Sequence, residues 1–168
     1  YTAVLSVTDD SSATELVITA EANAAGKDPA SASLTVAIVH PPANDNFDER
    51  AGLSGRKVSL SGFTNRSATA EDNEPRHYRA KPQKSVWFTW ASPRTGRADI
   101  WLKGSDFDTV MAVYRGSTLD NLRRVARDDD GGGKLTSRVR FNVRKGRTYH
   151  FAVDGWGKAE GDINGRLV

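Results

Sequence analysis

The sequence predicts an all-β protein: an antiparallel β-sandwich of jelly-roll type with about eight strands, preceded by a β-hairpin or immunoglobulin-like remnant. Short apolar runs that alternate with polar residues recur along the chain, with Gly, Asn and Ser between them. No stretch has sustained helical periodicity. The chain has 168 residues and no cysteine, so we expect an ordinary hydrophobic core without disulfides.

The first 41 residues read as a separate piece. Alternating segments predict strands over residues 1–8, 15–22 and 31–39, joined by turns at 9–12 and 23–28. Three such strands cannot bury a core alone, so we expect them to belong to a neighbouring module or to dock on the main domain. Prolines at 41 and 42 end this piece, which places a second domain at 42–168. Because the chain starts at Tyr1, we take it as part of a longer polypeptide.

The main domain is organised around residues 85–116. The segments 86–90, 98–102 and 110–114 each read as two alternating sets of side chains, and this period of two predicts three strands with one buried face each. Further strands are expected at 58–63, 123–126, 138–143, 149–153 and 163–168. We also expect one helical turn over 118–122, with its leucines facing inward, and a hairpin turn at Lys145-Gly146.

The formal net charge is +3, and the basic residues are scattered along the chain. Nucleic-acid binding would need a basic stripe interleaved with aromatic residues, so we expect an ordinary solvated surface and no nucleic-acid partner. A polyanion such as an acidic polysaccharide stays open as a partner. No apolar run approaches the roughly 20 residues of a membrane span.

Acidic residues in two loops and one turn suggest a metal site. Calcium takes about six to eight oxygen ligands, mostly carboxylates and carbonyls. Loops at one end of a sandwich can converge, and the glycines at 131–133 would let the chain turn its carbonyls inward. The alternative is a flexible acidic turn in which Asp108 caps backbone amides of the next strand. The candidate ligands are Asp106, Asp108, Asp128, Asp129, Asp130 and Glu74.

Catalysis has little support. His77 with Glu74 could be a ligand pair or a general-base pair, and the alternative is a hydrogen bond that anchors a loop. There is no serine in a nucleophile motif and no cysteine, and three histidines far apart give no zinc pattern. We therefore expect a protein that is not an enzyme.

Two tryptophans are candidates for ligand contact. Trp87 has the opposite parity to Phe88 and Trp90, so we expect it to show on the solvent face of its strand. Trp156 lies between glycines in a loop, where an exposed ring could stack on a sugar. The alternative is that all four tryptophans close the core or its edges.

Several motifs in order resemble one family. They are Asn-Asp-Asn-Phe at 44–47, Glu-Pro-Arg-His at 74–77, Ser-Val-Trp-Phe-Thr-Trp at 85–90, Gly-Ser-Asp-Phe-Asp-Thr-Val-Met-Ala-Val-Tyr at 104–114, Asp-Asp at 129–130 and Gly-Arg-Thr-Tyr-His-Phe-Ala-Val-Asp-Gly at 146–155. Over residues 43–168 the chain resembles the bacterial pre-peptidase C-terminal (PPC) domain group, although the stretch from 72 to 81 is more charged than in that family. Residues 1–41 resemble the tail of an immunoglobulin-like or polycystic-kidney-disease (PKD)-type repeat.

The resemblance implies a non-catalytic, frequently calcium-bound sandwich attached to secreted enzymes and surface proteins. We therefore expect a secreted or cell-surface bacterial accessory module, stabilised by Ca²⁺ and adjoining other domains of the same polypeptide. It would attach to polysaccharide or to an extracellular protein, with Trp156, Trp87 and His77 as candidate contacts. The alternative is a pre-peptidase-type segment that assists secretion or maturation of a secreted hydrolase and is then removed.

Overall fold

The computed structural model describes residues 15–22, 30–37 and 39–168, which fall into two compact units, Tyr1–His40 and Pro41–Val168. In the first unit, β1 (Glu15–Ala22) pairs antiparallel with β2 (Ala30–Ala37). The hairpin confirms the strands expected at 15–22 and near 31–39. The strand expected at 1–8 lies outside the described residues.

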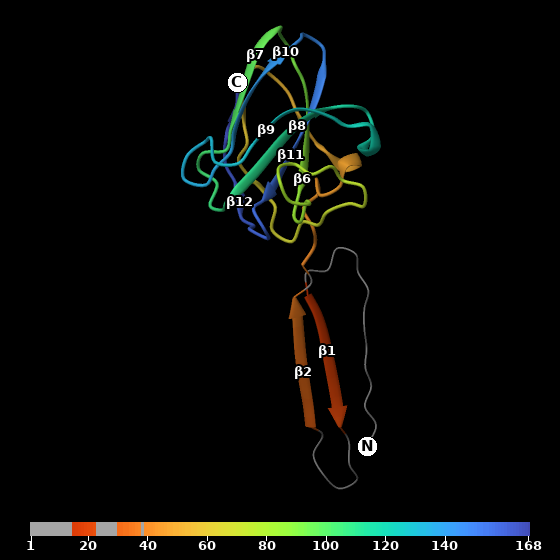
Figure 1. Cartoon of the computed structure of the whole chain (residues 1–168). Coiled ribbons are helices and arrows are strands. Elements are labelled where there is room, and N and C mark those ends of the chain that lie inside the picture. Colours follow the sequence, from red (N-terminus) through yellow and green to blue (C-terminus); the bar gives the residue numbers. More distant parts are fainter. Residues whose placement is uncertain (1–14, 23–29, 38) are drawn as a thin grey trace. The chain divides into compact units, whose positions relative to one another are not determined.

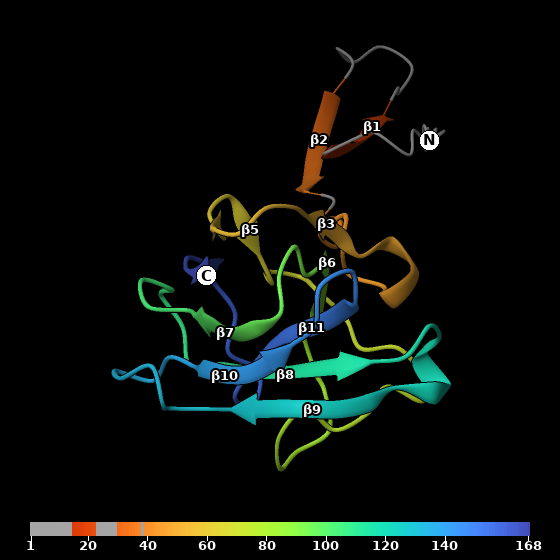
Figure 2. The same ribbon diagram turned by 90° about the horizontal axis from the view of Figure 1, so that it is seen from above.

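The second unit is a β-sandwich of two sheets, as the sequence predicts (Figure 1). One sheet has four strands in the order β10-β7-β13-β4, and the other has five in the order β3-β6-β11-β8-β9. Figure 2 shows β9 running beside β8 at the edge of the five-stranded sheet. The bounds of the four-stranded sheet are β4 Val58–Ser59, β7 Gly96–Trp101, β10 Arg138–Val143 and β13 Arg166–Leu167. Those of the five-stranded sheet are β3 Ala51–Leu53, β6 Val86–Ala91, β8 Thr109–Arg115, β9 Arg123–Asp128 and β11 Thr148–Gly155.

Short elements complete the unit. β5 (Phe63–Thr64) pairs with β12 (Asp162–Ile163), and two 3-10 helices, η1 (Phe47–Glu49) and η2 (Leu119–Asn121), lie in loops. The turn η2 confirms the helical turn expected at 118–122, and Leu119 within it and Leu122 directly after it are partly buried. Among the described residues, no helix has the length and hydropathy needed to cross a membrane.

The core lies between the two sheets because alternate residues of each strand point inward. In β10, Val139, Phe141 and Val143 are buried, whereas Arg140 and Asn142 are exposed. From the other sheet, Phe88 and Phe151 stack with ring centroids 4.8 Å apart. Burying apolar side chains of this size contributes roughly 1.5–3 kcal/mol each, so this layer is the main source of stability.

The five-stranded sheet is also covered on its outer face. There, Phe47, Trp87, Ala112, Tyr114 and Ala152 form a second apolar cluster, which we call the outer cluster. As a result, the first six residues of β8 are all buried. Period-two alternation distinguishes the two faces of a strand but does not show that a loop covers the second face.

The expectation that Trp87 shows to solvent is therefore wrong. Its indole is fully buried, and Phe47 packs edge-on against it with ring centroids 5.0 Å apart. Asn44 closes the cover, because its side-chain amide donates to the Trp87 carbonyl and its own carbonyl accepts from the Trp87 amide.

The Lys145-Gly146 turn is not a hairpin. The strands on either side of it, β10 and β11, belong to different sheets, so the turn crosses from one layer of the sandwich to the other. Its composition predicts a reversal of the chain, and this part is correct. Whether two amphipathic strands pair or pack face to face depends on contacts far away in the sequence.

Three further differences concern short strands. The segment 58–63 divides into β4 and β5, and the segment 163–168 divides into β12 and β13. β3 was not expected, and it pairs with β6 in parallel, with Ala51 opposite Phe88. Strands of two or three residues carry too little alternation to be recognised.

Candidate functional site

Three of the predicted metal ligands come together at one end of the sandwich. One carboxylate oxygen from each of Asp108, Asp129 and Asp130 lies within 4.8 Å of the others. Asp108 directly precedes β8, and Asp129 and Asp130 directly follow β9. Since β8 and β9 are antiparallel, with Met111 opposite Asp128, the start of one strand meets the end of the other. This pairing explains why acids about 20 residues apart converge.

The electrostatics of this carboxylate cluster are unfavourable without a cation. Burial and then the charge of Asp130 raise the pKa of Asp108. Burial raises the pKa of Asp129 as well, with the neighbouring carboxylates as the next cause. Among the described residues, Asp108 Oδ1 is buried and has no hydrogen-bond partner. Hard oxygen donors held close together, one of them unpaired, suit a divalent cation.

The carboxylates of Asp128 and Asp106 are engaged in hydrogen bonds or ion pairs within the protein. Asp128 Oδ2 accepts from the Gly131 amide at 2.7 Å and from the Arg138 amide at 2.8 Å, so it shapes the glycine turn beside the cluster. Asp106 accepts from the Asp162 amide at 2.6 Å and pairs with Arg66 at 3.0 Å. The structure therefore does not bring Asp106 into the carboxylate cluster.

Glu74 lies in a buried hydrogen-bond network that packs against the outer face of the five-stranded sheet. Its Oε1 lies 2.8 Å from His77 Nε2 and accepts from the Ser85 hydroxyl at 2.5 Å. His77 Nδ1 lies 2.8 Å from the Tyr114 hydroxyl, whose pKa is raised by burial. The Glu74 and His77 side chains are each 1% exposed. This is the geometry of the loop-anchoring alternative, and it keeps both residues away from a ligand at the surface.

Trp156 is the predicted contact residue that does reach solvent. Its side chain is 45% exposed, and its ring packs at an angle to Tyr78, with centroids 6.5 Å apart. Guanidinium groups of Arg79 and Arg127 lie over the Tyr78 ring at 5.4 and 5.1 Å. The Trp156 amide donates to the Asp108 carbonyl at 2.9 Å, so the exposed ring adjoins the carboxylate cluster.

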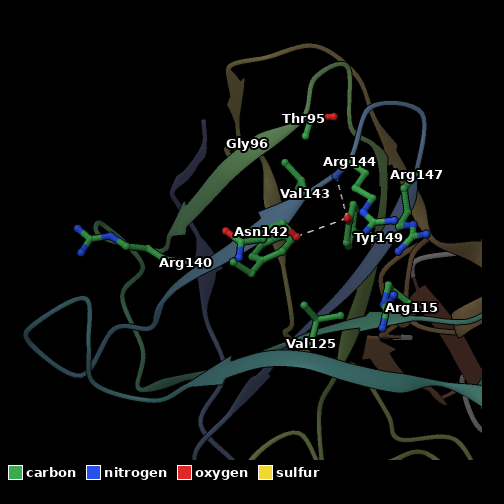
Figure 3. Close-up of a pocket in the computed structure, with 11 residues that line it drawn as sticks. Thr95, Gly96, Arg115, Val125, Arg140, Asn142, Val143, Arg144, Arg147 and Tyr149 are labelled. Carbon is green, nitrogen blue, oxygen red and sulfur yellow. Dashed lines mark hydrogen bonds between the residues drawn. The ribbon is translucent and has the colours of Figure 1, made fainter.

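One cavity of the sandwich was not predicted. It has a volume of about 640 Å³ and includes residues from β8, β9, β10 and β11. Figure 3 shows Arg115, Arg144 and Arg147 gathered beside Tyr149, while Arg140 extends away on the opposite side. Tyr149 is held in place, because its hydroxyl accepts from the Arg144 amide at 3.1 Å and donates to the Asn142 carbonyl at 3.5 Å.

The sequence contains only a partial signal for this arginine cavity. Arg144 and Arg147 flank the Lys145-Gly146 turn, but Arg115 lies almost thirty positions earlier, at the end of β8. The register of β8 on β11, with Tyr114 opposite His150, brings that strand end to the turn. The sequence thus indicates the arginine pair at the turn, but it does not indicate that Arg115 joins the pair.

No protein-family model matches the chain, and no curated protein matches it. Among solved structures, the chain is similar to one of ZmpB from Clostridium perfringens, described as CBM51-2 in complex with GlcNAc and INT domains. The sequence identity is 10% and the TM-score is 0.30. The match covers 91% of this chain and 37% of that chain, so the present chain spans well under half of its length.

Proposed function

We propose that the sandwich is a non-catalytic accessory module of a secreted or cell-surface protein, which binds Ca²⁺ and attaches to polysaccharide through Trp156. The observation that carries this proposal is the hydrogen bond from the Trp156 amide to the Asp108 carbonyl, at 2.9 Å. It joins an exposed aromatic ring to a cluster of three carboxylates. A cation held there would fix the backbone on which the ring stands.

Calcium fits the donor chemistry of the cluster. Asp108, Asp129 and Asp130 would supply carboxylate oxygens, and water or carbonyls of the adjoining glycine turn would complete the shell. A divalent cation would relieve the repulsion that raises the pKa of Asp108 and Asp129, and would give Asp108 Oδ1 a partner. Asp128 is already committed to the turn and would support the site indirectly.

A sugar fits the aromatic pair. An exposed indole with a second ring at an angle provides an apolar surface for one face of a sugar, and polar edges remain available for its hydroxyls. Trp156 stands one residue beyond β11, the central strand of its sheet. Asp154 anchors that strand end by accepting from the Lys84 amide at 2.9 Å and the Gln83 amide at 3.2 Å.

The non-catalytic part of the proposal is supported by the state of Glu74 and His77. Both residues are candidates for acid–base chemistry, and both side chains are buried and hydrogen-bonded. A general base must lie within hydrogen-bonding reach of a proton on the substrate. The hollow that His77 lines together with Trp156 has a volume of only about 10 Å³, which is too small for a substrate.

Calcium is expected to raise the melting temperature of the domain, and EDTA to reverse the effect. A ligand at 100 times its dissociation constant stabilises by about 2.7 kcal/mol, which is roughly 10 °C for a domain of this size. Asp108→Asn should abolish the shift and, in EDTA, should raise the melting temperature slightly because it removes a repelled, unpaired carboxylate. Thermal unfolding followed by circular dichroism would measure both effects.

The control is Asp120→Asn, which removes an exposed acid outside the cluster and should keep the full calcium shift. The shift should also depend on pH. In the metal-free domain the raised pKa of Asp108 and Asp129 means that the folded state holds protons more tightly than the unfolded state. The stability of the metal-free domain therefore falls as pH rises from the usual carboxyl pKa through the raised pKa values of Asp108 and Asp129. The calcium shift grows over the same pH range. A calcium shift that is absent at neutral pH would contradict the metal site.

Replacing Trp156 with alanine is expected to weaken polysaccharide binding roughly tenfold, since an aromatic contact contributes about 0.5–1.5 kcal/mol beyond its buried area. Affinity electrophoresis through gels containing neutral polysaccharides would measure the loss. The melting temperature should barely change because the side chain is 45% exposed. Trp156→Phe is the matched control and should retain most of the binding. If the polysaccharide gel retards the alanine variant as strongly as the wild type, Trp156 is not part of the binding site.

A further inference from the structure

The arginine cavity has the charge of a binding site for anions. The cavity of about 640 Å³ is lined by Arg115, Arg140, Arg144 and Arg147, and no aspartate or glutamate lines it. Across the described part of the chain, the guanidinium groups of Arg115, Arg144 and Arg147 have no ion pair or hydrogen-bond acceptor. Like charges gathered without counter-charges repel one another, so an anion between them would be stabilising.

The walls add a surface suited to a sugar. Val125 is partly exposed on the wall of the cavity, and the buried side chains of Phe141 and Val143 form its floor. Tyr149 stands beside the arginines with its hydroxyl already bonded (Figure 3). A cavity of this size falls within the range of about 300–1,000 Å³ that is typical of small-ligand sites. Planar guanidinium groups recognise carboxylate and sulfate oxygens in pairs, which a single lysine does not do.

The basic surface continues beyond the cavity. Arg140, which pairs with Asp99 at 3.1 Å, also lines a neighbouring hollow of about 280 Å³ with Arg94, Arg97 and Asp99, on the outer face of the four-stranded sheet. Next to it, Arg138, Arg166 and Lys103 lie over the ring of Trp101 at 4.7, 5.0 and 5.1 Å. Some of the bases that are scattered in the sequence thus lie close together on this sheet. This continuity favours a polymer over a single small anion.

We propose that the arginine cavity binds a carboxylate or sulfate group of an acidic polysaccharide, whose chain continues over Arg140 onto the four-stranded sheet. The surface lacks the means to read nucleic acid. Single strands require exposed aromatic rings for stacking, whereas the Trp101 ring is already occupied by three cations. The site is independent of the carboxylate cluster and of Trp156.

The test compares the wild type with the triple variant Arg115→Gln, Arg144→Gln, Arg147→Gln. Isothermal titration in EDTA would use a sulfated polysaccharide, polygalacturonate, neutral dextran and duplex DNA. We expect binding to the sulfated polymer, the uronate polymer or both, which identifies the acidic group, and none to dextran. Each guanidinium that bonds an anion contributes roughly a tenfold change in affinity, so the triple variant should lose at least that factor. The presence of EDTA separates this result from the calcium-dependent proposal.

The matched control is Arg56→Gln, Arg76→Gln, Lys158→Gln, which removes the same charge from exposed positions that do not line the cavity. It should keep most of the affinity. Equal losses in both triple variants would show that the surface charge acts in general and would overturn the cavity. Tighter binding of DNA than of either acidic polysaccharide would overturn the assignment of the ligand. All six positions are exposed, and unchanged melting temperatures would confirm that the variants fold.

Discussion

Trp87→Ala is expected to lower the free energy of unfolding by about 3–5 kcal/mol, the usual cost of emptying a buried aromatic site. The indole is fully buried in the outer cluster and is surrounded by Phe47, His77 and Tyr114, with ring centroids at 5.0, 5.3 and 5.8 Å. These neighbours come from three separate segments, so no single shift can close the cavity. The melting temperature should fall by roughly 10–20 °C.

Urea unfolding monitored by circular dichroism would measure the change in stability. Trp156→Ala is the matched control, because the same substitution at a half-exposed ring should cost little. Trp87→Phe should cost less than alanine, since it fills part of the space and removes an indole N–H that has no partner among the described residues. A loss below about 1 kcal/mol for Trp87→Ala would show that the loop does not seal the outer face.

Glu74→Ala is expected to cost about 3–5 kcal/mol, which is typical when one member of a buried, hydrogen-bonded pair is removed. The substitution would leave His77 Nε2 and the Ser85 hydroxyl without their shared acceptor in a site closed to water. It would also free the Glu71 amide, which donates to Glu74 Oε2 at 3.1 Å. Glu71 in turn accepts from the Phe47 amide at 2.6 Å, so the loss should spread to the cover of the outer cluster.

A double-mutant cycle with His77→Ala would isolate the coupling between the two side chains. We expect the double variant to be less destabilised than the sum of the single variants, because each single variant leaves a polar group unpaired. Asp72→Ala, at an exposed carboxylate in the same loop, is the control and should change stability by less than about 0.5 kcal/mol. Additive effects of Glu74→Ala and His77→Ala would contradict a shared buried network.

The strands of the sandwich were largely predictable because alternation is a local property. Strand β10 lies where apolar and polar residues alternate, at 138–143, whereas β6 and β8 are short apolar runs between turn residues, at 86–91 and 109–115. The assignment of strands to sheets was not local. The Lys145-Gly146 turn gives no indication that β10 and β11 separate into different layers. Similarly, the parity of Trp87 is correct, but the loop that buries it lies in segments around 44–49 and 74–77.

The residues of the candidate sites were likewise predictable only where the sequence signal is local. Asp129 and Asp130 next to three glycines gave a compositional signal, and the pairing of β8 with β9 brings Asp108 to them. Asp106 gave the same signal, yet it turns to Arg66, a partner forty positions earlier in the chain. Arg115 gave no signal, because an isolated arginine at a strand end resembles any other surface charge. Its position in the arginine cavity depends on the register of β8 on β11.

The covering of the five-stranded sheet has a consequence for how this domain could diversify. Strand β8 is buried on both sides over its first six residues, so nearly every substitution in it disturbs packing. β10, at the edge of the four-stranded sheet, has only one buried side, and its outward residues can change at little cost to folding. New ligand preferences can therefore arise on the four-stranded sheet and in the loops while the five-stranded sheet stays fixed. One layer of the sandwich would preserve the fold, and the other would be free to vary.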